Sequence, residues 1–109
     1  MAEHLPPQLL EQVAERFRVL GDASRLAILK TLLEEDEMNV GQIVERLGTT
    51  QANVSKHLRV LLAAGVVQRR PVGTAAYYSL ADRSVLDLCD IVCGRLREQI
   101  RGQWSLITA

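Results

Sequence analysis

The chain has 109 residues, of which 48% are hydrophobic, and its 13 basic and 13 acidic side chains give a formal net charge of zero. This length and composition suit a single globular domain with a modest core, spanning residues 1–109, and exclude a disordered tail. Because no apolar run reaches membrane-spanning length and the N-terminus lacks signal-peptide features, we expect a cytoplasmic protein without a membrane partner.

The first half of the chain predicts three helices. The first starts at Pro6-Pro7 and ends near Gly21, with an apolar face of Leu10, Val13, Phe17 and Leu20. The second is capped by Asp22 and faces inward through Leu26, Leu29 and Leu33, with Ile28 and Leu32 beside them. The acidic run 34–37 closes it as a solvated turn. A short third helix is capped by Asn39, ends at Gly48 and has the apolar set Val40, Ile43, Val44 and Leu47.

Residues 49–65 predict a fourth helix with one apolar and one polar, basic face. Thr50 is a suitable N-cap and Gly65 a suitable stop. At 100° per residue the apolar stripe consists of Val54, Leu58, Leu61 and Leu62. The opposite face consists of Ala52, Lys56 and Arg59, with Asn53 and Val60 at one margin and Gln51 and Ser55 at the other.

A strand–turn–strand pattern and a last helix complete the chain. The strands are 66–70 and 75–80, joined by a turn at 71–74, and together they predict a two-stranded wing. Ser84 caps the last helix, which runs to about residue 101 with the apolar set Val85, Leu88, Cys89, Val92, Cys93, Leu96 and Ile100. The order is that of a winged helix-turn-helix, mainly α with a small β wing, over a core of residues 8–101.

The charge distribution favours DNA as a partner despite the zero net charge. Residues 1–48 carry five basic and nine acidic side chains, whereas residues 49–80 carry four basic side chains and no acid. Phosphate binding needs a local positive face. The candidate DNA contacts are Thr50, Gln51, Ala52, Asn53, Ser55, Lys56, His57, Arg59, Arg69, Arg70 and Thr74. For His57, on the flank of the helix, the alternatives are a packing role or a phosphate contact.

Other functions remain as alternatives. The fourth helix alone could be an ordinary amphipathic helix with a solvated face. A winged helix used only for protein interaction or dimerisation is the runner-up, but such a surface has no need to exclude carboxylates. An enzyme is not expected, because the sequence has no glycine-rich phosphate loop, nucleophile elbow or Cys-X-X-Cys pair.

The first and last helices, about 7–20 and 84–101, each have an apolar face. So small a domain has too little other core to bury both faces. We therefore expect a homodimer in which these two helices pack across a twofold axis. Two recognition helices related by that axis would read an inverted repeat in double-stranded DNA.

Three motifs in order resemble the ArsR/SmtB family of bacterial winged-helix repressors. They are segments 20–29 (LGDASRLAIL), 55–61 (SKHLRVL) with 64–67 (AGVV), and 70–80 (RPVGTAAYYSL), and the resemblance spans residues 11–101. It implies a homodimeric repressor that leaves its operator when an inducer binds. Arg25, within the first motif, reads as a surface ion-pair partner.

Many members of that family sense metal ions, but the ligand positions that the resemblance implies are changed here. Asn39 and Gly41 stand where the metalloid site of the third helix has two cysteines. In the zinc-type site of the last helix, Asp82 matches the first ligand, Ser84 replaces a histidine, and Arg95 and Glu98 stand at the later positions. Arg95 stays protonated and cannot coordinate a metal. Thr74 stands where a basic residue is common at the wing tip.

Cys89 and Cys93 are the remaining candidates for a sensor. One helical turn separates them, which is too wide for a disulfide within one helix without local unwinding. Soft thiolates at this spacing can share a thiophilic ion such as As(III), Cd(II) or Cu(I), and a dimer could bring four thiols together. The favoured alternative is that both are small hydrophobic residues in the dimer seam. We expect no required cofactor. The candidate inducer is a thiophilic metal ion, a metalloid or an oxidant that acts at Cys89 and Cys93.

Overall fold

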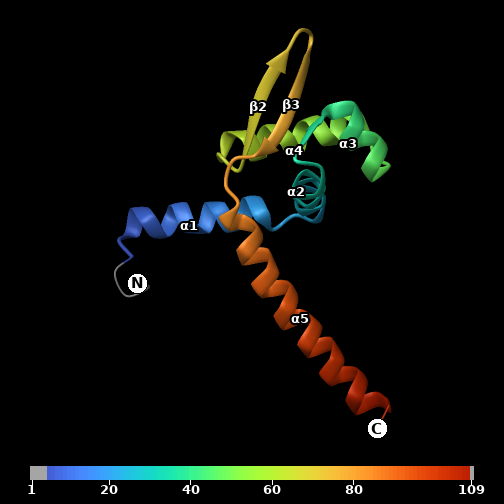
Figure 1. Cartoon of the computed structure of the whole chain (residues 1–109). Helices are drawn as coiled ribbons and strands as arrows, with labels where there is room; N and C mark the ends of the chain where they lie inside the picture. Colours follow the sequence, from blue (N-terminus) through green and yellow to red (C-terminus); the bar gives the residue numbers. More distant parts are fainter. Residues whose placement is uncertain (1–4, 109) are drawn as a thin grey trace.

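The computed structural model describes the backbone of residues 5–108 and the side chains of residues 5–103. Five helices and three strands follow in the order α1 (Pro7–Leu20), α2 (Ala23–Glu35), β1 (Glu37–Asn39), α3 (Val40–Leu47), α4 (Gln51–Ala63), β2 (Val67–Val72), β3 (Ala75–Leu80) and α5 (Ser84–Thr108). Figure 1 shows α2, α3 and α4 grouped beside the β2–β3 hairpin. Helices α1 and α5 extend away from this group. The predicted winged helix-turn-helix is confirmed, with one strand more than expected.

The helix boundaries follow the predicted caps. The Asp22 carboxylate accepts from the backbone N–H of Arg25, and Asn39 forms a capping box with Gln42. Gly48 ends α3 in the left-handed conformation at φ 65°, which glycine adopts without steric cost. At the start of α5, Asp82 rather than Ser84 supplies the acceptor, since its carboxylate binds both the backbone N–H and the hydroxyl of Ser84.

The sheet is antiparallel, with strand order β1-β3-β2. Strand β1 was not predicted, and it pairs with β3 through Glu37 opposite Ser79 and Asn39 opposite Tyr77. Strand β2 starts one residue later and ends two residues later than the predicted strand 66–70, so Pro71 belongs to it, opposite Ala76. Proline has no N–H to donate to a ladder, and it is tolerated here because β2 lies at the edge of the sheet.

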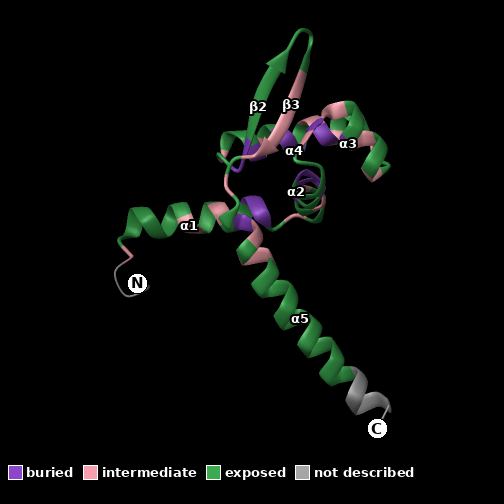
Figure 2. Cartoon of the chain, in the orientation of Figure 1, coloured by how far each residue is buried: buried purple, intermediate pink, exposed green. Residues whose placement is uncertain are grey.

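The core lies where α2, α3 and α4 meet the base of the hairpin, as the purple segments in Figure 2 show. Its most deeply buried side chains are Val19, Ile28, Leu29, Leu32, Ile43, Val54, Leu58, Leu61 and Val66. The predicted inward positions were partly wrong. Leu26, Leu33 and Leu62 are exposed at 37–40%, because the helix faces that contact neighbours centre on Ile28 and Leu32 in α2 and on Leu58 in α4.

Arg25 is not the surface ion-pair partner that we expected. Its side chain is only 12% exposed, and its Nε donates to the carbonyl oxygen of Val19 at 2.5 Å. Its Nη2 donates to the carbonyl oxygen of Arg18 at 3.3 Å. The expected ion pair is present, with Asp22 at 4.0 Å, but Arg25 itself is largely buried and not at the surface. Arg25 therefore binds the carbonyl end of α1, where the helix dipole favours a cation.

Helices α1 and α5 leave much of their apolar surface uncovered. The stripe of α5 begins in the core at Val85, which is 4% exposed, and continues along the same face to Val92, Leu96 and Ile100, which are 51–52% exposed. In α1, Leu10 and Phe17 are 54% and 53% exposed. Figure 2 shows both helices largely exposed beyond the body of the domain. No helix among the described residues is long and apolar enough to span a bilayer.

Candidate nucleic-acid interface

The face of α4 that points away from the core is polar, basic and accessible. Gln51, Ala52, Lys56 and Arg59 are exposed, and Ser55 is half-buried at the margin. The opposite face is anchored by Val54, Leu58 and Leu61, each at most 1% exposed. Helix α4 therefore presents one continuous outer surface, which is fixed in orientation by the core behind it.

The N-terminus of α4 is held by its own side chains. The Thr50 hydroxyl accepts from the backbone N–H of Asn53 at 3.1 Å, as the predicted N-cap requires. The amide of Asn53 donates to the Thr49 hydroxyl at 3.0 Å and is half-buried. An Asn or Gln amide must be free at both ends to bind adenine bidentately. Gln51, which is exposed, is therefore better placed for base contact than Asn53.

His57 lies inside the domain, where it cannot contact DNA, so the predicted contact at this position is wrong and the packing alternative holds. Its side chain is 5% exposed, and its Nδ1 lies 3.3 Å from Nη1 of Arg25. Because a guanidinium only donates, Nδ1 of His57 is the acceptor in this contact. His57 takes the place in the buried stripe that the sequence pattern assigned to Leu62. Arg25 thus contacts both the end of α1 and the buried side of α4.

The two wing arginines point to opposite faces of the sheet, because successive strand residues alternate. Arg70 lies on the face of Tyr77, with its guanidinium carbon 5.5 Å from the ring centroid. Arg69 is paired with Tyr78, on the face that also carries the buried Met38. Both arginines and Thr74 are exposed.

Arg70 is paired with the carboxylate of Glu37, which lies outside the acid-free segment 49–80. Its Nε and Nη2 donate to the two Glu37 oxygens at 2.9 and 2.6 Å. These hydrogen bonds hold the pKa of the Glu37 carboxyl below, and the pKa of Arg70 above, their ordinary values. Within residues 5–103, no carboxylate forms an ion pair with Lys56, Arg59 or Arg69. Among residues 49–80, the unpaired positive charge therefore lies on α4 and on one wing arginine.

The acidic run before β1 is not simply a solvated turn. Glu34 and Glu35 accept from Arg46 of α3 at 2.6 and 2.9 Å, and Glu37 accepts from Arg70. Sequence reasoning missed the roles of Glu37 and Arg25 because their partners lie 33 and 32 residues away. The sequence carries no signal for the role of Glu37, because β1 has only three residues, which are too few for an alternating pattern.

The metal-ligand positions implied by the family resemblance do not fit a metal. The Asn39 side chain is used in the capping box, Asp82 is bound to Ser84 and Arg16, and Arg95 pairs with Glu98 at 3.0 Å. No group of three or more His, Cys, Asp or Glu side chains in the described part of the chain is arranged to hold a metal ion.

The two cysteines differ in their surroundings. Cys89 is half-buried against the core, and burial, followed by the neighbouring Asp90 carboxylate, raises the pKa of its thiol. Cys93 is exposed on the projecting part of α5. A raised pKa keeps the Cys89 thiol protonated at neutral pH and makes it a poor nucleophile.

Comparison with known proteins identifies relatives along most of the chain. Residues 22–69 match the family model described as bacterial regulatory protein, arsR family. An uncharacterised HTH-type transcriptional regulator of Methanocaldococcus jannaschii is 39% identical over 82 residues, covering 75% of this chain and 92% of the relative. The arsenical resistance operon repressor of Bacillus subtilis is 33% identical over 78 residues, covering 72% and 74%.

A solved structure extends this likeness to three dimensions. The solution NMR structure of a homodimeric winged helix-turn-helix DNA-binding domain from Mycobacterium bovis, described as a possible ArsR-family transcriptional regulator, matches with a TM-score of 0.72. The two sequences are 33% identical, and the match covers 84% of this chain and 83% of the other.

Proposed function

Because the chain belongs to the ArsR family of bacterial regulatory proteins, it is a DNA-binding transcriptional regulator, and we propose that it acts as a homodimeric repressor. Helix α4 of each protomer enters a major groove, and the β2–β3 hairpin lies against the flanking backbone. The two protomers read an inverted repeat, with half-sites one helical turn or more apart.

One observation carries the proposal: the exposed face of α4 holds Lys56 and Arg59 without a neutralising carboxylate among the described residues. Arginine and lysine bind guanine edges or phosphate, while Gln51 and Ser55 can bind base edges. Thr50, Ala52 and Asn53 line the N-terminal end of this surface, and Arg69, Arg70 and Thr74 add the wing. A face for protein interaction would not need this concentration of unpaired positive charge.

The dimer that we propose covers the apolar surfaces of α1 and α5. The stripe Val92, Leu96 and Ile100 continues from the domain core into solvent, and exposed apolar patches of this kind mark interaction sites. A second copy of the chain is the partner we propose, because the M. bovis relative of the same fold is homodimeric. This arrangement presents two α4 helices on one side of the twofold axis.

Binding to DNA from upstream of its own gene tests the proposal by fluorescence anisotropy. A dimer that makes about 6–10 phosphate contacts should lose on the order of 10³-fold or more in affinity between 50 and 200 mM salt. Replacing Lys56 or Arg59 with Ala should weaken binding and lower the salt slope by about 2 per dimer. Lys30→Ala is the matched control, because Lys30 is an exposed lysine on α2. Equal affinities for all these variants would refute the groove assignment.

The inducer is a finer proposal and rests on the α5 cysteines. The exposed Cys93 lies one helical turn from Cys89, on the helix that we propose forms the dimer interface, so that the pairs of two protomers could supply four thiols to a thiophilic ion. The repressor of an arsenical resistance operon among the relatives makes As(III) the first ion to test. The competing proposal is a packing role for both cysteines, which the half-buried, protonated Cys89 supports.

The two proposals for the cysteines differ in one measurement. The reduced protein is bound to its DNA and titrated with As(III), Cd(II) or Cu(I), alongside a Cys89→Ser/Cys93→Ser double variant. If one of these ions releases the wild-type protein from DNA while the double variant stays bound, the cysteine pair is the sensor. If the ions change the DNA binding of neither protein, both cysteines have a packing role, and the repressor proposal is unaffected.

A further inference from the structure

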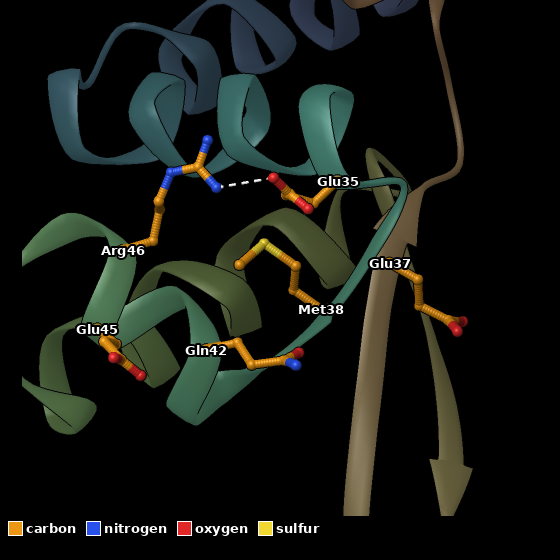
Figure 3. A pocket seen from close by; sticks show the side chains of 6 residues that line it. All are labelled: Glu35, Glu37, Met38, Gln42, Glu45 and Arg46. Carbon is orange, nitrogen blue, oxygen red and sulfur yellow. Dashed lines mark hydrogen bonds and ion pairs between the residues drawn. The ribbon is translucent and has the colours of Figure 1, made fainter.

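Glu37 and Arg70 form an ion pair that bridges the whole width of the sheet. Glu37 comes from β1 and Arg70 from β2, and β3 lies between these strands. The strand register places both on the face of Tyr77 and Ser79, and the fork of the guanidinium binds both carboxylate oxygens. Figure 3 shows a cleft lined by Glu35, Glu37, Met38, Gln42, Glu45 and Arg46. The Glu37 side chain points away from Glu35 and Arg46, which form an ion pair with each other. Glu37 therefore pairs with Arg70 of the wing, whereas Arg46 pairs with Glu34 and Glu35.

The pair is built so that another anion can replace the carboxylate. Guanidinium binds carboxylate and phosphate with the same bidentate geometry, so one edge of Arg70 can hold only one of them at a time. The Arg70 side chain is 60% exposed and the Glu37 side chain 35% exposed. A phosphate can therefore reach the arginine, and the carboxylate can turn into water when it is displaced. Tyr77 beneath the guanidinium supports Arg70 in either state.

We propose that Glu37 is a specificity-determining residue that competes with DNA phosphate for Arg70. The inference rests on the proposed DNA-binding function of the wing. On random DNA, the wing is not fixed against any one phosphate. The Glu37 carboxylate therefore stays paired with Arg70, and Arg70 makes no contact with the DNA backbone. At the operator, base contacts from α4 fix the wing against one phosphate, which displaces Glu37. The ion pair therefore lowers non-specific affinity more than operator affinity.

Glu37→Gln tests this inference by anisotropy on two fluorescent duplexes, the upstream DNA of the gene and a scrambled duplex of equal length. Affinity for the scrambled duplex should rise about 3- to 10-fold, because two arginines per dimer become available. Its salt slope should steepen by up to about 2, whereas affinity for the upstream DNA should change by about twofold or less. Circular dichroism establishes that the variant is folded.

Two controls separate competition for Arg70 from a general change in charge. Glu45→Gln removes an exposed carboxylate of α3 that lines the same cleft and has no ion pair within residues 5–103. It should leave both affinities nearly unchanged. In an Arg70→Ala background, Glu37→Gln should have no further effect on the scrambled duplex. An equal rise in Glu45→Gln, a rise that persists without Arg70, or no rise at all would overturn the inference.

The same titrations distinguish this failure from failure of the proposed function. If Lys56→Ala weakens DNA binding and Glu37→Gln changes nothing, α4 still binds DNA and only the role of Glu37 is wrong. If neither Lys56→Ala nor Arg59→Ala changes DNA affinity, the groove assignment itself is wrong, and with it the premise of the inference.

Discussion

Truncating Leu96 to Ala should weaken the dimer without unfolding the protomer. Leu96 lies on the exposed stretch of the α5 stripe and is 51% exposed. Full burial of a leucine side chain contributes about 1.5–3 kcal/mol, so burying the remaining half contributes about 1 kcal/mol. Two copies meet across the twofold axis, which gives about 2 kcal/mol per dimer, or about a 30-fold higher dissociation constant.

Sedimentation velocity over a range of protein concentrations measures this dissociation constant. Leu33→Ala is the control, because Leu33 on α2 is a leucine of similar exposure, 40%, outside α1 and α5. Thermal unfolding of each variant at low concentration would report the protomer itself, which should be little affected by either change. If Leu96→Ala and Leu33→Ala dissociate at the same concentration as the wild type, the proposed use of α5 as the dimer interface is wrong.

Three further predictions concern stability. Thr50→Ala removes the side-chain acceptor of the Asn53 N–H and should lower the free energy of unfolding by about 1 kcal/mol in urea titrations, whereas Thr50→Ser should be nearly neutral. Arg25→Ala removes the link between the end of α1 and His57 and should cost about 2 kcal/mol in the same assay; a loss no larger than that of the exposed Arg18→Ala would contradict the role assigned to Arg25. Acid should destabilise the protein through Asp82, because the hydrogen bonds from Ser84, together with Arg16, hold the pKa of this carboxyl below 3.8. A lowered folded-state pKa means that the contribution is complete above the unfolded-state pKa and is lost as pH falls through the folded-state value. Thermal melts from pH 7 to pH 2 should therefore show a smaller acid-induced drop in Tm for Asp82→Asn than for the wild type, and equal drops would show that Asp82 does not contribute.

Local chemistry was sufficient to predict most of the helices. Asp22, Asn39 and Thr50 each accept from the backbone N–H three residues later, and Gly48 adopts the left-handed conformation that ends α3. These signals involve neighbours in the chain and so can be read without a structure. The polar face of α4 also follows from helical periodicity, because Lys56 and Arg59 lie opposite Val54 and Leu58 on a helix of 3.6 residues per turn.

The features that were missed depend on contacts between distant segments. Strand β1 has three residues, too few for a periodic signal, and it forms only because β3 offers a free edge. Periodicity alone placed Leu62 in the core, but Arg25 of α2 approaches the other margin of α4 and makes His57 the buried residue. The sequence likewise carries no sign that Arg70 is ion-paired, because Glu37 comes beside it only through the pairing of strands in the sheet.

Hydroxyl-radical footprinting of the wild-type protein on its upstream DNA tests the central claim most directly. Two α4 helices related by a twofold axis should protect two backbone segments, centred one helical turn or a small multiple of it apart and flanking an inverted repeat. Lys56→Ala should weaken both segments equally, because each protomer supplies the same contact. A single protected segment, or uniform protection without a repeat, would contradict the account of a dimer that reads DNA through α4.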